Sequence, residues 1–383
     1  MRLALRRLCG VAALLLVALS LACSRPAATV ANSWDQKAAA SYLDQRESAW
    51  MAWPGAARDH GTFCVSCHTS VPYALARPLL RTALSENALS PNERRLLDNV
   101  ARRVRLWKEL EPFYNGEGYD AQKANESRGT EAVVNALILT SYDAQNGRLS
   151  DDTRAAFDSM WAFQETTGEN NGAWPWLQFD LEPWEANDSP YYGATLAALA
   201  VGMAPGNYRS APEIQHNLEM LREYLDREYA QQSPLNRVSL LLASAKWPEL
   251  LSQERKESII HEVLAKQRRD GGWQLASLQW GGWSPITLLH RWIREDGTPI
   301  EGKSDAYATG VATFALEQSG IPRTNAEVQR GLSWLARNQN KTEGLWEASS
   351  LNKRRNSSSN VGRFMSDAAT AYAVLALTES SPR

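Results

Sequence analysis

The residues best suited to carry out chemistry are Cys64, Cys67 and His68, which form a Cys-x-x-Cys-His pattern. Two thiols at this spacing can form thioether bonds to the two vinyl groups of one porphyrin, and the adjacent imidazole then becomes an axial iron ligand. The pattern therefore predicts a covalent c-type haem, with His68 bound to its iron. A structural disulfide or free-thiol role and a zinc site are the alternatives, because thiolates and imidazoles also bind zinc.

A haem iron also needs a sixth ligand or an open coordination position. Met365 and His60 are the two candidates for that ligand. Met365 directly precedes an apolar segment, residues 368–377, that we expect to lie beside the segment following His68. His60 comes four residues before Cys64, and in a zinc site it would join the two cysteines, with or without His68.

The first residues of the chain resemble an export signal. Residues 1–22 have a basic start and an apolar run that is too short to span a membrane, as in secretory signals. The end of this run is similar to a bacterial lipoprotein signal, in which Cys23 would be lipidated, although plain cleavage is the alternative. We expect residues 23–33 to be a tether and residues 34–383 one domain, held in the periplasm or cell envelope by a lipid anchor only.

Composition excludes some partners and suggests others. The 41 basic and 43 acidic residues give a net charge of −2, and no basic block exists that would follow a phosphate backbone, so nucleic acid is excluded as a partner. The 15 tryptophans are the unusual feature. Several lie in expected connections between helices, where they would either pack the loops or form a wall against a flat apolar ligand such as an isoprenoid or a porphyrin. These are Trp174, Trp176, Trp184, Trp280 and Trp283.

Helices of two kinds alternate along the chain. Amphipathic helices are predicted to start near Asn32, Ser90, Ser150, Ser210, Ser252 and Thr324, and capping-box patterns occur at Ser90, Ser210 and Thr324. The other helices are apolar on nearly all sides and should be buried. They are predicted at 131–141, 191–202, 238–245, 307–316 and 368–377, with a further one after His68.

The alternation repeats at intervals of about sixty residues, which indicates six helical hairpins. Such hairpins cannot bury their apolar faces alone, so we predict an all-α (α/α)6 toroid with parallel inner helices. One rim would then collect the helix N-termini, His68 and a set of carboxylates. These carboxylates are candidate catalytic residues, although simple helix capping also explains them. They are Glu131, Glu185, Asp188, Asp305 and Asp367.

Three segments are similar to a known repeat. Residues 330–339 followed by Gly344-Leu345-Trp346 closely resemble the QW repeat of squalene-hopene cyclases, related triterpene cyclases and protein prenyltransferase β subunits. Residues 267–273 match its second half, and residues 164–174 form a weaker copy. The resemblance implies an α/α toroid in which the glutamine and tryptophan tie an outer helix to the loop after it. The residues given this role are Gln267, Trp273, Gln339 and Trp346.

The resemblance does not extend to the catalytic motifs of that family. No Asp-x-Asp-Asp acid motif is present, and Thr370 stands where the prenyltransferases have a zinc-binding histidine. We therefore expect an exported haem protein that performs electron transfer or redox chemistry with a partner protein. The alternatives are an isoprenoid-binding or terpenoid cyclase-like protein that uses the central cavity, and a non-catalytic scaffold.

Overall fold

The computed structural model describes residues 34–116, 118–280 and 293–378. The chain divides into two units, Met1–Ser33 and Trp34–Arg383, and only the second contains described residues. The predicted signal, the lipidation site Cys23, the tether and Trp283 therefore lie outside the described residues. Within the described ranges, no helix has the length and apolar character needed to cross a membrane.

The protein is mostly helical, as predicted for an all-α fold. Helix accounts for 61% of the structure, and strand is almost absent. The two short strands β1 (Ala57–Arg58) and β2 (Thr62–Phe63) pair antiparallel, and the turn between them is a 3-10 helix, η1 (Asp59–Gly61). This small hairpin lies directly before the Cys64–His68 segment.

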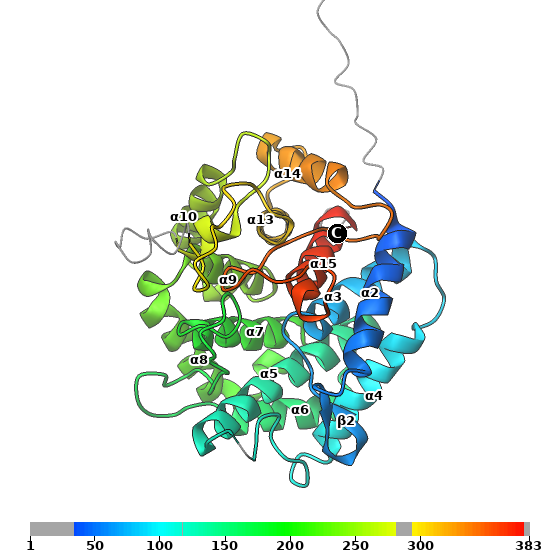
Figure 1. The fold of residues 1–383 in the computed structure, drawn as a ribbon. Helices are drawn as coiled ribbons and strands as arrows, with labels where there is room; N and C mark the ends of the chain where they lie inside the picture. The colour runs from blue at the N-terminus through cyan, green and yellow to red at the C-terminus, as the bar shows by residue number, and fades with distance from the viewer. Residues whose placement is uncertain (1–33, 117, 281–292, 379–383) are drawn as a thin grey trace, which may run out of the picture. The chain divides into compact units, whose positions relative to one another are not determined.

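Six amphipathic helices lie on the outside of the described unit (Figure 1). Each buries one face against the interior, as α4 does with Leu96, Val100 and Val104. These outer helices are α2 (Gln36–Met51), α4 (Pro91–Arg105), α6 (Asp151–Ala162), α8 (Gln215–Glu228), α10 (Gln253–Ala265) and α14 (Ala326–Arg337).

Six apolar helices lie inside them. Contacts join neighbouring members in the order α3, α5, α7, α9, α13 and α15, and α15 in turn packs on α3. Small residues permit the close packing; at Gly310 in α13 an added Cβ would lie 2.9 Å from the Ala373 amide nitrogen in α15. The inner helices are α3 (Ser70–Ala83), α5 (Ala121–Asn146), α7 (Ser189–Met203), α9 (Pro234–Lys246), α13 (Ala306–Gln318) and α15 (Phe364–Thr378).

Short helices fill the connections between these two sets. They are α11 (Leu275–Gln279), η2 (Tyr208–Ser210), η3 (Pro212–Ile214), η4 (Tyr229–Gln231), η5 (Pro248–Leu250) and η6 (Val361–Arg363).

Some predicted helix starts are wrong. Ser90 forms the expected reciprocal capping box. Ser210 does not cap α8, because it lies inside the 3-10 turn η2 and lacks the extended backbone that a capping residue needs. The cap of α14 is Asn325 rather than Thr324, since the Asn325 side chain accepts hydrogen bonds from the Glu327 and Val328 amides.

The QW-like segments make the same contacts in three places. Each tryptophan indole N–H donates to a carbonyl in the last turn of the preceding outer helix: Trp174 to Met160 in α6, Trp273 to Val263 in α10, and Trp346 to Leu335 in α14. Each glutamine amide donates to a glycine carbonyl in the following turn and to a second carbonyl at the next outer helix. The glutamine pairs are Gln164 with Gly172 and Asn217, Gln267 with Gly271 and Glu327, and Gln339 with Gly344 and Asp35.

Candidate functional site

The Cys64–His68 segment connects strand β2 to helix α3 and is fixed by several hydrogen bonds. The Cys64 amide donates to the Ala56 carbonyl at 2.8 Å, and the Trp50 indole donates to the Cys64 carbonyl at 2.7 Å. Ser66 Oγ accepts the amides of Thr69 and Ser70 at 3.2 and 3.0 Å, so it satisfies free donors at the start of α3. The segment is therefore held rigidly at both ends.

Cys64 and Cys67 are both buried and are not joined in a disulfide. Burial raises the pKa of the Cys64 thiol to about 12 and the pKa of Cys67 well above its ordinary value, because a thiolate loses its hydration there. Both side chains are consequently neutral thiols at physiological pH.

His68 is oriented by hydrogen bonding at one ring nitrogen. Its Nδ1 lies 2.8 Å from Thr69 Oγ1, and the Thr69 hydroxyl donates to Asp367 Oδ2 at 2.8 Å. Because that hydroxyl uses its one proton to donate to the carboxylate, it accepts a hydrogen bond from Nδ1–H. The network assigns the Nδ1–H tautomer and leaves the Nε2 lone pair available as a ligand.

Asp367 completes this chain of hydrogen bonds from the first turn of α15. Its carboxylate accepts from Arg46 Nε at 2.7 Å, from Arg46 Nη2 at 3.0 Å and from the Tyr42 hydroxyl at 2.8 Å. Burial raises the pKa of Asp367 above its usual range, and the hydrogen bonds and charge of Arg46 offset part of that rise. Burial disfavours the charged imidazolium and lowers the pKa of His68 to about 3, and the positive charge of Arg46 lowers it by a smaller amount.

Aromatic side chains fix the plane of the His68 ring. Phe364 stacks on it with a centroid separation of 3.7 Å and an interplanar angle of 17°. Trp50 meets it edge-on at 5.0 Å, and Trp184 lies at 6.2 Å. The imidazole is thus positioned both by packing and by its Nδ1 hydrogen bond.

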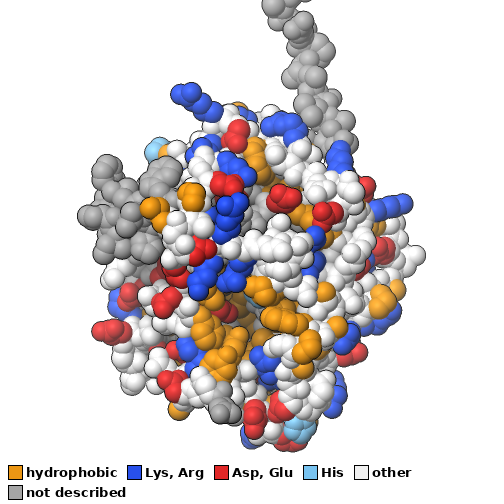
Figure 2. Space-filling view, viewed as in Figure 1, with side chains coloured by type: hydrophobic (Ala, Val, Ile, Leu, Met, Phe, Trp, Pro, Cys, Tyr) orange, Lys and Arg blue, Asp and Glu red, His pale blue; other side chains and the backbone are white. Residues whose placement is uncertain are grey.

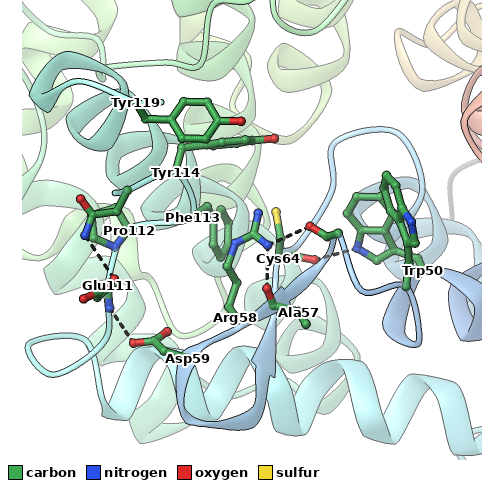
Figure 3. Close-up of a pocket in the computed structure, with 13 residues that line it drawn as sticks. Trp50, Ala57, Arg58, Asp59, Cys64, Glu111, Pro112, Phe113, Tyr114 and Tyr119 are labelled. Atoms are coloured by element: carbon green, nitrogen blue, oxygen red, sulfur yellow. Dashed lines mark hydrogen bonds between the residues drawn. The ribbon is translucent and has the colours of Figure 1, made fainter. Parts of the chain in front are cut away.

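Two adjacent cavities border the Cys-His segment. The first, of about 540 Å³, is lined by Cys67, His68 and Met365 among others; the second, of about 650 Å³, is lined by Cys64. They share four wall residues: Trp50, Trp53, Tyr114 and Tyr119. Figure 3 shows Cys64 between Arg58 and Trp50 in the second cavity. Figure 2 shows a hollow in the molecular face that hydrophobic side chains surround, with basic side chains along one border.

Of the predicted rim carboxylates, Glu185 lies in the cavity beside His68 and Asp305 lies at the start of α13. Glu185 lines the same cavity as Cys67 and His68, and burial raises its pKa to about 7. Asp305 caps α13 by accepting from the Ala308 amide, and burial raises its pKa to about 6. Tyr307, in the first turn of α13, accepts a hydrogen bond from the Trp184 indole.

The other two carboxylates have structural partners. Asp188 precedes α7 and accepts from Asn236 Nδ2 at 3.0 Å. Glu131 does not lie at a helix N-terminus, because α5 begins well before it, at Ala121. Buried within that helix, it pairs with Arg103 at 2.5 Å and with Arg128 at 3.3 Å.

The two candidates for the sixth ligand differ in position. Met365 is buried and lines the cavity that His68 borders. His60 is exposed in the turn between β1 and β2, with φ of 52°, and lines neither cavity. Among the described residues, no group of three His, Cys, Asp or Glu side chains is arranged to hold a metal ion.

The tryptophans predicted as a ligand wall divide into two groups. Trp174 and Trp176 are fully buried and pack the loops, and Trp176 donates to the Trp184 carbonyl. Trp184 lines the cavity beside His68, together with Trp50 and Trp53, which sequence reasoning did not assign to it.

Comparison with protein families and with curated proteins finds no match to this chain. The resemblance to QW-repeat proteins therefore rests on the residues of the chain itself.

Proposed function

We propose that this chain is an exported c-type haem protein built on an (α/α)6 toroid and used for electron transfer or redox chemistry. The observation that carries the proposal is the state of His68: its Nδ1 is engaged through Thr69, its Nε2 is free, and it borders a cavity of about 540 Å³ together with Cys67. Ligand pockets typically measure about 300–1,000 Å³, so the volume suits a flat cofactor.

The toroid is supported by the order of helix contacts. Each inner helix packs on the next, and α15 returns to α3. The Gln339 ties to Asp35 and Gly344 join the last outer helix to the first in the same way as the two earlier QW-like copies. Three such ties and the order of helix contacts support the toroid that the resemblance implies.

The residues present fit a covalently bound haem. Cys64 and Cys67 would form the thioether bonds, His68 Nε2 would bind the iron, and Met365 would supply a second iron ligand. When bound, the haem would supply reversible one-electron chemistry. Arg58 lines one cavity and Lys353 and Arg355 the other, so three cations are available to offset the haem carboxylates.

This function also requires export, because haem c is attached outside the cytoplasm. Cleavage before Cys23 and its lipidation would place the protein in the periplasm or cell envelope on a lipid anchor. A redox partner protein would then approach the face bearing the two cavities. Zinc bound by the same cysteines is the competing use, and cyclase-like chemistry lacks its acid motif.

Expression in a host with the haem c maturation machinery tests the proposal. We expect denatured protein to retain covalent haem, and we expect Cys64→Ala/Cys67→Ala to lose it. Val65→Ala is the matched control, since it changes the same segment but leaves both thiols. A colourless wild-type protein with bound zinc would refute the haem assignment.

A second variant tests the Thr69 connection. Thr69→Val keeps the side-chain shape but cannot accept the hydrogen bond from His68 Nδ1–H. Hydrogen bonding at Nδ1 makes the imidazole a stronger electron donor, so its loss should raise the reduction potential while covalent haem is retained. An unchanged potential would show that Thr69 and Asp367 do not act on the iron ligand.

A further inference from the structure

A third cavity, of about 340 Å³, lies among the inner helices away from the Cys-His segment. All six inner helices contribute to its lining, and most do so with residues of their last turn. The contributing residues nearest the six helix ends are Thr82, Gln145, Met203, Lys246, Gln318 and Leu375. The C-terminal ends of the inner helices therefore converge on this cavity.

The cavity is separate from the proposed haem site. On α15, Met365 lines the cavity beside His68 and Leu375 lines this one, and ten residues of helix correspond to about 15 Å. Aromatic rings fill part of the interior between them: Trp184 packs on Tyr307 at 5.4 Å, and Tyr307 packs on Tyr372 at 5.5 Å. A ligand in one cavity would not occupy the other.

The lining changes from apolar to polar along the cavity. Ala74 and Leu375 are buried at its inner end. Thr82, Gln145 and Lys246 are exposed at its mouth. The described lining contains no Asp or Glu. Apart from the polar residues at the mouth, it consists mainly of aliphatic side chains. This gradient fits a molecule with one apolar chain and a single polar head.

The charges around the mouth restrict the head group. Each helix C-terminus carries about half a negative charge. Guanidinium groups donate to end carbonyls of α9 and α15, from Arg209 to Lys246 and from Arg323 to Ala376, so the ends of the other four helices oppose an anion. Within the described lining, Lys246 is the one charged residue, and its ammonium opposes a second cation. A neutral head that donates hydrogen bonds to carbonyls satisfies both conditions, and a hydroxyl is the simplest such group.

We propose that this cavity binds a long-chain alcohol, with its chain between the inner helices and its hydroxyl at the mouth. The binding depends only on the helix ends and their side chains, so it is independent of whether Cys64 and Cys67 hold a haem.

A series of ligands with one chain and different heads tests the proposal. Radiolabelled dodecanol, dodecanoate and dodecylammonium would each be measured by equilibrium binding to the full-length protein. We expect saturable binding of dodecanol at one class of site, and binding of the other two weaker by about tenfold or more, which corresponds to about 1.4 kcal/mol. Tighter binding of the carboxylate or the amine would overturn the head-group assignment, and no saturable binding would overturn the site.

Cavity-filling variants locate the binding. Leu199 and Leu79 line the cavity from different helices and are only half-buried, so Leu199→Trp and Leu79→Trp can place an indole in it. Each should weaken dodecanol binding about tenfold or more. Leu97→Trp, on outer helix α4, is the control. Circular dichroism would establish that all three variants fold, and dodecanol binding unchanged in folded Leu199→Trp and Leu79→Trp would refute the location.

Discussion

The contact between the last and first outer helices allows the stability lost on substituting Gly344 to be predicted. This residue lies in the turn after α14 with φ of +81°, and an added Cβ would lie 2.0 Å from the Ala38 carbonyl oxygen in α2. The same turn is tied to the start of α2 by Gln339, whose side chain exchanges hydrogen bonds with the Asp35 backbone at 2.6 and 2.9 Å. Gly344→Ala should therefore force the two helices apart.

The expected loss of stability has two components. A non-glycine residue in the left-handed conformation costs about 1–2 kcal/mol. Displacing a packed neighbour costs about 1–3 kcal/mol more, so the total for Gly344→Ala is about 2–5 kcal/mol. Gly320→Ala is the matched control, because Gly320 has φ of +94° but no atom within 4 Å of its added Cβ. That variant should cost only the conformational component.

Urea unfolding followed by circular dichroism measures both variants. We expect the midpoint of Gly344→Ala to fall clearly below that of Gly320→Ala, with little change in the denaturant dependence. Equal midpoints would show that the contact between the turn and α2 does not constrain the native state, and the reasoning about closure of the outer layer would fail.

Three further predictions concern buried polar groups. Asp367→Asn leaves the Arg46 guanidinium buried without its counter-charge, so urea unfolding should show a loss of about 3–5 kcal/mol; a loss below 1 kcal/mol would contradict the pairing. Burial raises the pKa of the Glu47 carboxyl to about 8. Between about pH 4.5 and pH 8 this carboxyl is ionised in the unfolded chain and protonated in the folded one, so the free energy of unfolding falls as pH rises, by at most about 1.4 kcal/mol per pH unit. Glu47→Gln should reduce that slope, and an identical slope would refute the assignment. In haem-free protein at pH 8, iodoacetamide should modify Cys64 and Cys67 only after denaturation, since both pKa values are raised; rapid labelling of the native protein would show accessible thiolates.

Much of the helical layout follows from local patterns in the sequence. Apolar segments without a polar face became the inner helices, because only the interior accepts such segments. The start of α5 was not predictable in this way, since residues 121–130 are largely polar and their helix is capped by Asp120. The start of α8 was missed because the serine pattern at Ser210 occurs within a 3-10 turn.

The candidate site was predictable only in its local part. The spacing of Cys64, Cys67 and His68 is visible in the sequence. The chain from Thr69 to Asp367 and Arg46 is not, because its hydrogen bonds join residues separated by 298 and 321 positions. The adjacency of Thr69 to His68 was the available clue, but only the packing of α15 beside α3 gives that hydroxyl a carboxylate to donate to.

The orientation of the inner helices links the two proposed ligand sites. Residues shortly before α3 and α7 and the first residues of α15 line the cavity beside His68, and Asp367 lies in the first turn of α15. The positive end of a helix dipole favours anionic groups, which suits a haem whose carboxylates need compensation. The ends of the inner helices face the third cavity, where the negative ends of the helix dipoles favour a hydrogen-bond donor without negative charge. A single arrangement of helices therefore predicts different ligand chemistry at its two ends. For the third cavity to prefer a carboxylate over a hydroxyl, it would need a cation more deeply buried than Lys246.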